Sequence, residues 1–554
     1  MGEIKGEKKS LSQLFSEEFF FNIPEYQRPY SWKTDHCEQL FDDIYESNRD
    51  NEYFLGTIIL QETGDIGKGK KYDIIDGQQR LTTLQILLAC LRDNVSDNQY
   101  NDPIQKKILQ EKNKAEGIPE RYRLEVRDKE FFKKHIQLPG STKHELPSIN
   151  QLSDACANII NAINVFESKL KDLSEDSIKH IIEHILQRCI LIYVSTSNFN
   201  DAFRLFTIVN DRGLQLRRID ILKSQNIEPS VIPIENDRKE FAKKWEQMED
   251  DLGSDEFEKL IFYLRSILVK EKAKDDILTE YNNLIFGKNK INKGKDFINF
   301  LYEYKKIYQS LFLDKNVFPN TDAKKTKFNN LIHIMNDYLP SGEWVSPLLY
   351  YFNKFNTAHL YEFLIKFEYK FVFDWLNGLS PTKRITNINS LLKEIESADN
   401  PKPLLASDIF EVDMNKLEEI LSDKDFYHKP YCKYVLVKLE YLSSDHDVEK
   451  KYNAVSIEHV LPRNPKKNSE WLNIFDEEQI EQWTNNIANL ILLSKRKNSA
   501  ASNKDFKDKK AKYFNDRISE LPRSMKIFDY SKWTPEILKK RHSEVVDKFK
   551  SNNI

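Results

Sequence analysis

The period of the hydrophobic pattern changes along the chain, and this change limits the folds available to it. Runs of strand length rich in β-branched residues lie before residue 80, at 191–197 and after residue 454. From about residue 235 to 430 the pattern is helical instead, with amphipathic stripes such as KLIFYLRSILV and FLIKFEYKFVFDWL. A chain of 554 residues also exceeds what one hydrophobic core usually organises. We therefore predict a helix-rich α+β protein of several domains with a helical middle region.

The first strands lead directly into a helix. YFLGTIILQ (53–61) and KYDIID (71–76) predict a hairpin, and residues 78–92 then carry leucines at helical spacing. Backbone N–H groups at a helix start attract phosphate, so this turn could cradle a nucleotide. The alternative is an ordinary capped helix. No GxxxxGK[ST] motif occurs, which argues against a P-loop enzyme.

The rest of the N-terminal third is mixed. FNIPEYQRPYSW (21–32) contains two prolines that favour extended structure. Residues of about 97–190 have the pattern of a helical insertion, and 191–197 return to strand. DAFRLFTIVNDRG then predicts a helix closed by Gly213, and LQLRRIDILKSQNI predicts another.

A second group of chemistry-bearing residues lies near the C-terminus. AVSIEHVLPRN predicts a short strand ending at Pro462, and NNIANLILLSKRKNSAASNKDFKDKK predicts strand, turn and basic helix. A ββα-metal (HNH) nuclease site needs a histidine on the first strand, an asparagine in the connection and a metal ligand on the helix, and these types appear in that order. A lone Glu-His pair would more often be structural.

Phosphodiester hydrolysis suggests a role for each residue of this group. His459 would be the general base, and the oxygens of Glu458 and Asn498 suit Mg²⁺ or Mn²⁺. Asn489 would brace the connecting segment through hydrogen bonds. Lysines would grip phosphates beside the cut, and one of them could stabilise the leaving oxygen; these are Lys504, Lys507, Lys509 and Lys510.

Charge and composition restrict the partners. Residues 495–554 hold 17 Lys or Arg against 8 Asp or Glu, a surplus that suits a polyanion such as DNA, although a solvated helical face is the alternative. The five cysteines form no CxxC pair, which argues against a zinc ribbon or a disulfide framework. No apolar run reaches 18 residues. We expect a cytoplasmic protein without a membrane partner.

Three long strings in the N-terminal part strongly resemble the motifs of GmrSD-type modification-dependent (type IV) restriction endonucleases. They are IPEYQRPYSW, DIIDGQQRLTTL and FRLFTIVNDRGLQLRRIDILK. The resemblance covers about 10–226 and implies a fold similar to ParB and sulfiredoxin that binds and hydrolyses a nucleotide. By match to the motifs, the nucleotide site would be lined by Gln27, Arg28, Asp76, Gly77, Gln78, Gln79 and Arg80, and closed by Asn210, Asp220 and Lys223.

The resemblance suggests roles for some of these residues. Arg28 and Arg80 would clamp phosphates, and Asp76 would hold a metal or a ribose hydroxyl. For Asp220 and Lys223, the alternative is a simple i,i+3 helix pair.

The C-terminal strings resemble the nuclease domain of the same family over about 435–520. They are IEHVLP, W-x-x-x-I-x-N-L-x-L-L and N-x-x-x-S-N-x-x-F-x-x-K. Most HNH sites carry Asp before the histidine, whereas this chain has Glu458, so a ligand role is less secure for Glu458 than the base role is for His459.

The predicted domains are therefore a nucleotide-binding sensor (1–226), a helical linking region (227–430) and an HNH nuclease with basic C-terminal helices (431–554). The resemblance implies an NTP-regulated endonuclease that cuts modified phage DNA, such as DNA with hydroxymethylated or glucosylated cytosine. One site cuts one strand, so a homodimer could be required. Two alternatives remain: a phosphorothioate-sensing nicking nuclease with NTPase activity, and a nucleotide-switched DNA-binding clamp without cleavage.

Overall fold

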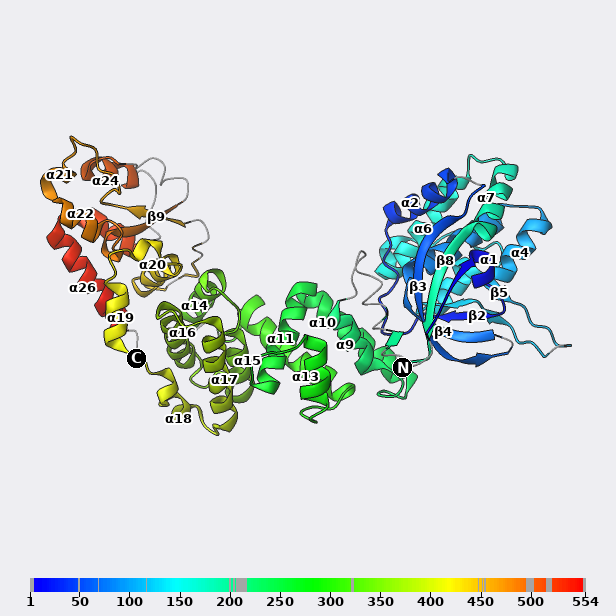
Figure 1. Cartoon of the computed structure of the whole chain (residues 1–554), viewed down its shortest axis with the longest axis horizontal. Coiled ribbons are helices and arrows are strands. Elements are labelled where there is room, and N and C mark those ends of the chain that lie inside the picture. The colour runs from blue at the N-terminus through cyan, green and yellow to red at the C-terminus, as the bar shows by residue number, and fades with distance from the viewer. Residues whose placement is uncertain are drawn as a thin grey trace. The chain divides into compact units, whose positions relative to one another are not determined.

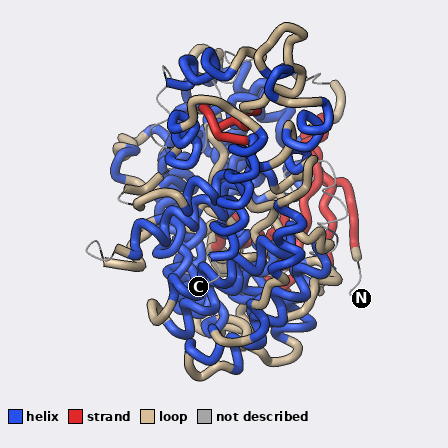
Figure 2. Tube along the Cα trace, turned by 90° about the vertical axis from the view of Figure 1, so that its left-hand side faces the viewer, coloured by secondary structure: helices blue, strands red, loops and turns tan. Residues whose placement is uncertain are grey.

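The computed structural model describes residues 4–47, 50–67, 69–115, 117–198, 201–202, 205, 217–319, 323–446, 448–450, 452, 455–494, 503–514 and 521–551. It confirms a helix-rich α+β architecture of more than one domain, with strands gathered in a few short stretches among many helices (Figure 2). The chain forms two compact units. Unit 1 comprises residues 1–246 and 293–295, and unit 2 comprises 247–292 and 296–554. Residues 227–246, which we assigned to the linking region, thus group with the N-terminal unit.

A six-stranded mixed sheet forms the centre of unit 1. Its order is β1-β8-β3-β4-β2-β7. The strands are β1 (Lys5–Ser10), β2 (Phe19–Asn22), β3 (Tyr53–Ile66), β4 (Gly69–Asp76), β7 (Leu124–Glu125) and β8 (Cys189–Thr196). β3 and β4 pair antiparallel, as the predicted hairpin requires, and β8 runs parallel to β3. A separate small pair joins β5 (Leu109–Gln110) to β6 (Arg121–Tyr122).

Helices pack beside this sheet (Figure 1). They are α1 (Leu11–Leu14), α2 (Thr34–Glu46), α3 (Gln78–Asp93), α4 (Asn98–Ile108), α5 (Lys129–Phe132), α6 (Asp154–Leu170) and α7 (Glu175–Gln187). Unit 1 also contains α9 (Arg218–Ile227) and most of α10 (Glu235–Leu252). Helix α3 is the central one, since all its residues from Leu81 to Arg92 are buried. The insertion at 97–190 is mainly helical, but its strand β7 extends the main sheet. The helix expected over DAFRLFTIVNDRG falls largely outside the described residues.

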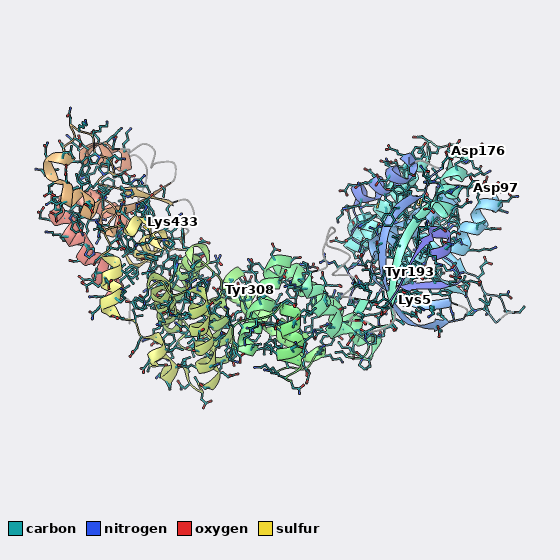
Figure 3. All side chains as sticks on the ribbon, in the orientation of Figure 1. Lys5, Asp97, Asp176, Tyr193, Tyr308 and Lys433 are labelled. Carbon is teal, nitrogen blue, oxygen red and sulfur yellow. The ribbon has the colours of Figure 1, made fainter. Side chains whose placement is uncertain are left out.

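Polar contacts also fasten the surface of unit 1. At one end, Lys179 of α7 reaches Asp97 at 3.0 Å, and Asp97 and Asp176 lie at that same end in Figure 3. On the sheet, Lys5 and Tyr193 belong to the paired strands β1 and β8 (Figure 3).

Unit 2 begins as a stack of helices. These are α11 (Ser254–Val269), α12 (Ile277–Glu280), α13 (Lys295–Tyr308), α14 (Lys324–Tyr338), α15 (Val345–Phe355), α16 (Leu360–Leu376), α17 (Pro381–Ser397), α18 (Pro401–Leu405), α19 (Met414–Leu421) and α20 (Cys432–Leu442). Their stripes form a core, as expected, but the core also holds charge. Lys438 of α20 donates to buried Glu368 of α16 at 2.8 Å, and the Tyr434 hydroxyl donates to the same carboxylate. Tyr308 of α13, labelled in Figure 3, donates to Glu256 of α11 at 2.5 Å.

The C-terminal part of unit 2 contains an antiparallel hairpin. β9 (Val455–His459) pairs with β10 (Leu490–Ser494), so that His459 lies opposite Leu490 and Glu458 lies opposite Ile491. The first strand ends at His459, before the predicted end at Pro462. Helices α21 (Trp471–Ile474), α22 (Glu477–Trp483), α24 (Phe506–Phe514), α25 (Pro522–Met525) and α26 (Pro535–Ser551) surround it. Their core includes Trp471, Phe506 and Trp533.

Short 3-10 and π turns connect the longer elements. They are η1 (Lys133–Gln137), η2 (Ser141–Lys143), η3 (Ile149–Gln151), η4 (Tyr281–Phe286), η5 (Gln309–Leu313), η6 (Asp408–Phe410), η7 (Phe426–His428), η8 (Ile487–Asn489) and η9 (Lys526–Asp529). Among the helices that the structure describes, none has both the length and the apolar character needed to cross a membrane.

Candidate active site and candidate nucleotide site

The end of β9 separates Glu458 from His459. Successive side chains of a strand point to opposite faces of a sheet. Glu458 therefore faces α24, whereas His459 faces Asn485, which lies between α22 and η8, and Tyr427 of η7.

Glu458 belongs to a buried ion pair. The Lys509 ammonium donates to Glu458 Oε1 at 2.8 Å and to the His459 carbonyl at 2.6 Å, and the Tyr513 hydroxyl donates to the same Oε1 at 2.8 Å. Burial lowers the pKa of Lys509, and its pairing with Glu458 opposes that shift. This triad fastens helix α24 to the strand directly behind His459.

His459 is itself almost enclosed, with 9% of its surface exposed. Its Nε2 lies 3.1 Å from Asn485 Oδ1. The amide oxygen can only accept, so the imidazole donates from Nε2 and keeps a lone pair on Nδ1. The Tyr427 ring meets the imidazole edge to face, with ring centroids 4.3 Å apart, and the Arg463 guanidinium lies 5.6 Å from the centre of the Tyr427 ring.

Burial is the main reason that the pKa of His459 falls from its ordinary value to about 4. The bond to Asn485 opposes this shift, while electrostatic interactions with Arg463, Lys509 and His428 reinforce it. The imidazole is thus neutral near pH 7, which is the form that can accept a proton from water.

Asn489 braces the segment, as we predicted. It is fully buried, and its Oδ1 accepts from the Leu461 N–H at 2.7 Å and from the Trp533 indole at 3.1 Å. Its amide group donates to the carbonyls of Leu461 and Thr484. The asparagine therefore ties the chain after His459 to the start of β10 and makes no surface that a substrate could touch.

The predicted lysines do not form one surface. Lys509 is buried in its ion pair, so its geometry differs from the expected phosphate contact. The Lys510 ammonium donates to the carbonyls of Phe528 and Tyr530, at 3.2 and 2.6 Å, and thus ties α24 to η9. Of the other two lysines, Lys507 is exposed and Lys504 is half-buried.

The predicted metal ligands are only partly placed. Asn498 lies outside the described residues. Glu458 keeps Oε1 on Lys509 and Tyr513, and within the described ranges no three His, Cys, Asp or Glu side chains gather as a metal would require. A metal ion at Glu458 Oε1 would have to displace Lys509 and Tyr513, so metal binding remains a prediction.

In unit 1, the predicted nucleotide motif folds as a strand that meets a helix at Gly77. Gly77 has φ of 92° and caps α3, and a Cβ there would lie 2.5 Å from Cγ2 of Ile58. Only glycine suits both the left-handed backbone and the close approach to β3.

Two glutamines join the first two motifs. Gln27 Nε2 donates to the carbonyls of Ile74 and Ile75, at 3.2 and 2.9 Å. Gln79 accepts from the Ser31 N–H at 2.8 Å and donates to the Pro29 carbonyl at 3.1 Å. These amide groups hold the IPEYQRPYSW loop against β4 and α3.

The first and third motifs meet through Arg28. Its Nη2 lies 2.6 Å from Asp220 Oδ2, although the residues are 192 positions apart. Lys223 does not form the alternative i,i+3 pair with Asp220, since its ammonium donates to Glu246 at 2.8 Å, and Glu246 also binds Arg127 at 2.6 Å. Burial lowers the pKa of Lys223, against the effect of Glu246.

The Arg80 guanidinium lies further inside the protein than a group that clamps a phosphate would. Its Nη1 donates to the Thr57 carbonyl at 3.1 Å, and its pKa is lowered by burial against the opposing effect of Asp76. A Cβ at Gly56 would lie 2.9 Å from Arg80 Nη1, so a glycine in β3 makes room for the guanidinium. Asn210 lies outside the described residues.

A small cavity lies among these residues. Its walls include Arg28, Gln78, Gln79, Arg127 and Asp128, and its volume of about 20 Å³ admits a group the size of water. Burial also raises the pKa of Asp128. A bound nucleotide would have to widen this space or lie outside it.

Both regions match family models. Residues 11–227 match the N-terminal domain of the GmrSD restriction endonucleases, and residues 411–548 match their C-terminal domain. Together these matches cover more than half of the chain. The chain belongs to the GmrSD restriction endonucleases. No curated protein matches it.

The GmrSD C-terminal match contains residues that sequence analysis missed. Asn485 orients His459, while Tyr427 and Arg463 border it. The Asn-rich string NNIAN before the second strand could have indicated Asn485. Tyr427 gives no comparable signal, because it lies 32 residues before His459.

Missed residues also occur around the nucleotide motifs. Arg127 and Asp128 border the cavity within the N-terminal match, and Glu246 pairs with Lys223 and Arg127 from beyond it. No motif indicates them, since the fold alone brings them to the site.

Proposed function

We propose that this GmrSD restriction endonuclease cuts DNA at an HNH-type site in which neutral His459 acts as general base. The observation that carries the proposal is the Nε2 bond to Asn485, which leaves a lone pair on Nδ1 of an imidazole whose pKa lies near 4. Such an imidazole is unprotonated at neutral pH, so its lone pair can accept a proton, although a pKa of about 4 makes it a weaker base than an ordinary histidine.

The chemical step is phosphodiester hydrolysis. A water molecule transfers one proton to His459 Nδ1 while its oxygen forms a bond to phosphorus, and the bond from phosphorus to the leaving deoxyribose oxygen breaks. That oxygen leaves with the bonding electron pair and takes a proton from solvent. Arg463 is exposed beside the imidazole and would neutralise charge on the scissile phosphate.

We further propose dependence on Mg²⁺ or Mn²⁺, with Glu458 and Asn498 as ligands. Such a cation would supply charge neutralisation at the phosphate. Glu458 would contribute its second oxygen, since Oε1 accepts from Lys509 and Tyr513.

The test is cleavage of supercoiled phage DNA by purified protein, with and without EDTA. We expect cleavage by the wild type with Mg²⁺ or Mn²⁺, and no cleavage by His459→Ala at any metal concentration. Unchanged cleavage in EDTA would contradict the metal proposal, and unchanged cleavage by the variant would contradict the role of His459.

For unit 1 we propose an NTP site that regulates cleavage and hydrolyses the nucleotide. It is supported by the junction of the three motifs at Arg28, Gln79 and Asp220. The Arg28 guanidinium already binds Asp220 of α9, so a nucleotide phosphate would compete with this carboxylate for Arg28. Nucleotide binding would thereby be coupled to the position of α9.

Titration calorimetry with each NTP tests this site. Asp76→Ala and Arg80→Ala should abolish binding and the effect of NTP on cleavage, with the nuclease site left intact. Wild-type affinity in both variants would show that DGQQR is only a capped helix.

The proposed substrate is modified phage DNA in the cytoplasm. A site that binds DNA through basic groups would also bind the host chromosome, so the protein needs a way to restrict cleavage to modified DNA. Initial rates on unmodified, hydroxymethylated, glucosylated and phosphorothioated DNA test this discrimination. Light scattering with and without DNA tests the homodimer.

Equal rates on all four DNAs under every nucleotide would contradict modification sensing. Preference for phosphorothioate, with nicking as the product, would favour the alternative nicking nuclease, and binding without cleavage would favour the clamp.

A further inference from the structure

A second charged cavity lies in unit 2, within the C-terminal GmrSD match but at residues that none of the proposed chemistry uses. Its volume is about 360 Å³, and its walls come from α20, α25, η9 and α26. Ligand cavities usually start at about 300 Å³, so this one can hold a small ligand or part of a larger one.

The walls of this cavity carry more positive than negative groups. The cations are Arg523, Lys526, Arg541 and Lys548, and the anions are Glu544 and Asp547. Both carboxylates are exposed, whereas Arg523 and Arg541 are buried, at 6% and 3% exposure. The two arginines thus lie deep in the cavity and the two carboxylates at its exposed mouth, where Lys526 is exposed and Lys548 is half-buried as well.

One buried hydrogen-bond donor of Arg541 lacks an acceptor among the described residues. Its Nε donates to the Ala488 carbonyl at 2.9 Å, but its buried Nη2 has no hydrogen-bond partner among the described residues. A buried donor without a partner is costly, and native proteins usually pair such groups with protein, water or ligand.

The neighbouring cations repel one another. Burial and then Arg541 lower the pKa of Arg523 to about 9, and burial, Lys526 and Arg523 lower the pKa of Lys548. Glu440, which accepts from the Arg523 and Ser524 backbone N–H groups, offsets only part of this charge. An anion between these groups would relieve the repulsion.

We propose that this cavity binds a phosphate group, carried either by a free phosphoanion or by the DNA backbone. Arg541 Nη2 would donate to the phosphate, and Arg523 would supply charge, since both of its Nη atoms already donate to carbonyls. The exposed Lys526 adds an ammonium donor, and so does Lys548, whose ammonium also donates to Ser443 Oγ at 2.6 Å.

The cavity also lies behind the nuclease hairpin. Arg523 donates to the carbonyls of Leu490 and Ile487, at 2.9 and 3.1 Å, and Arg541 donates to that of Ala488. These three carbonyls flank Asn489, the brace of the chain after His459. A phosphate bound here would therefore stabilise the second strand of the active site from its rear.

The experiment measures binding of inorganic phosphate to the full chain by titration calorimetry, with thermal unfolding at matched ionic strength as a second readout. We expect saturable binding and a rise in Tm with phosphate but not with chloride. The double variant Lys526→Ala/Lys548→Met should weaken binding about tenfold or more, because charge-assisted hydrogen bonds are lost.

Two variants guard against misfolding and general charge effects. Lys539→Ala removes an exposed lysine of the same helix that does not line the cavity, and it should bind phosphate like the wild type. Glu544→Gln removes a carboxylate from the mouth and should tighten binding, an effect that unfolding cannot mimic.

A short DNA duplex distinguishes the sources of the phosphate. If the ligand is DNA, the double variant loses duplex affinity with a shallower salt dependence, and inorganic phosphate competes with the duplex. If the ligand is a free phosphoanion, duplex affinity is unchanged and phosphate binding alone is lost. Absence of phosphate binding, or equal binding by wild type and double variant, with unchanged duplex affinity would overturn the proposal.

Discussion

The two candidate sites each contain an ion pair that joins distant segments, yet the pairs differ in their surroundings. Glu458 and Lys509 are almost completely buried, and Lys509 also holds the His459 carbonyl. Arg28 and Asp220 join two motifs of unit 1, but about half of the Arg28 side chain is exposed.

The buried Glu458–Lys509 pair is a fixed structural contact, which we call the lock, whereas the Arg28–Asp220 pair is a contact that a ligand can replace. Removing one partner of a buried pair leaves an unpaired buried charge, which is strongly destabilising. A pair with one partner in solvent contributes little to stability, so a ligand can replace one member at low cost. The nuclease hairpin is thus fixed before substrate arrives, whereas the nucleotide motifs are joined by a contact that a phosphate can take over.

The largest expected effect is on catalysis at the fixed hairpin. His459→Ala should lower the cleavage rate by about 10²–10⁴, the usual contribution of a general base, while NTP binding in unit 1 stays at the wild-type level. Single-turnover cleavage and calorimetry measure the two quantities. Cleavage within threefold of the wild type would remove His459 from the mechanism.

Breaking the lock should affect stability most. Glu458→Ala leaves the Lys509 ammonium buried without its partner and should lower the free energy of unfolding of the C-terminal region by about 3–5 kcal/mol. Urea denaturation followed by tryptophan fluorescence measures it, since Trp471 and Trp533 lie in this core. Glu458→Ala/Lys509→Met should recover part of the loss. A loss below about 1 kcal/mol would show that the pair is not a lock.

Asn485 tests whether the orientation of His459 matters as well as its presence. Asn485→Ala removes the acceptor of the Nε2 proton, so the imidazole can rotate and change tautomer. We expect a loss of about 10–100-fold in kcat with little change in KM or stability, as for other orienting partners. Asn485→Asp keeps an acceptor and should recover part of the rate. An unchanged kcat in the alanine variant would contradict the positioning role.

The exposed pair should behave in the opposite way from the lock. Asp220→Asn should change the free energy of unfolding of unit 1 by about 0–1 kcal/mol. It should tighten NTP binding, because Arg28 loses its competing carboxylate. Lys129→Gln, which removes an exposed i,i+4 pair with Glu125 outside the cavity walls, is the control. Weaker NTP binding by Asp220→Asn would show instead that Asp220 itself contacts the nucleotide.

The last expected effect is a pH dependence of stability. The pKa of His459 is about 4 in the folded protein, below its ordinary value of 6.5. As pH falls from 6.5 toward 4, the unfolded chain takes up this proton before the folded chain does, so the stability contribution of the neutral imidazole is lost over this window. Denaturation at pH 7 and pH 5 should show a smaller drop for His459→Asn than for the wild type. Equal drops would contradict the shifted pKa.

Much of the architecture followed from local patterns. The switch of period at Asp76-Gly77 correctly predicted a strand that leads into a helix, and the hairpin β3–β4 also forms. The string NNIANLILLS correctly placed a strand after Asn489. The short strand β7 was not foreseen, because two residues carry no periodicity and the strand exists only by pairing with β2.

The site residues were predictable to different degrees. The sequence indicated His459 and the bracing role of Asn489, because their order along the chain is constrained by the hairpin. It did not indicate that Glu458 would turn away from His459 toward Lys509, although alternation along a strand requires neighbours to face opposite ways. Which face holds α24 is decided by the packing of Phe506 and Tyr513 into the C-terminal core.

By itself the sequence determined the helix-rich α+β class and the strand-to-helix turn at Gly77, and it supplied the residues of both candidate sites, because these depend on backbone preferences and spacing along the chain. Only the tertiary structure decided that Arg28 meets Asp220, that Lys509 is buried, that Asn485 holds His459 and that a cationic cavity lies behind β10. The physical reason is that pairing, burial and pKa depend on which groups come together in space, and residues far apart in sequence carry no local signal of their partners.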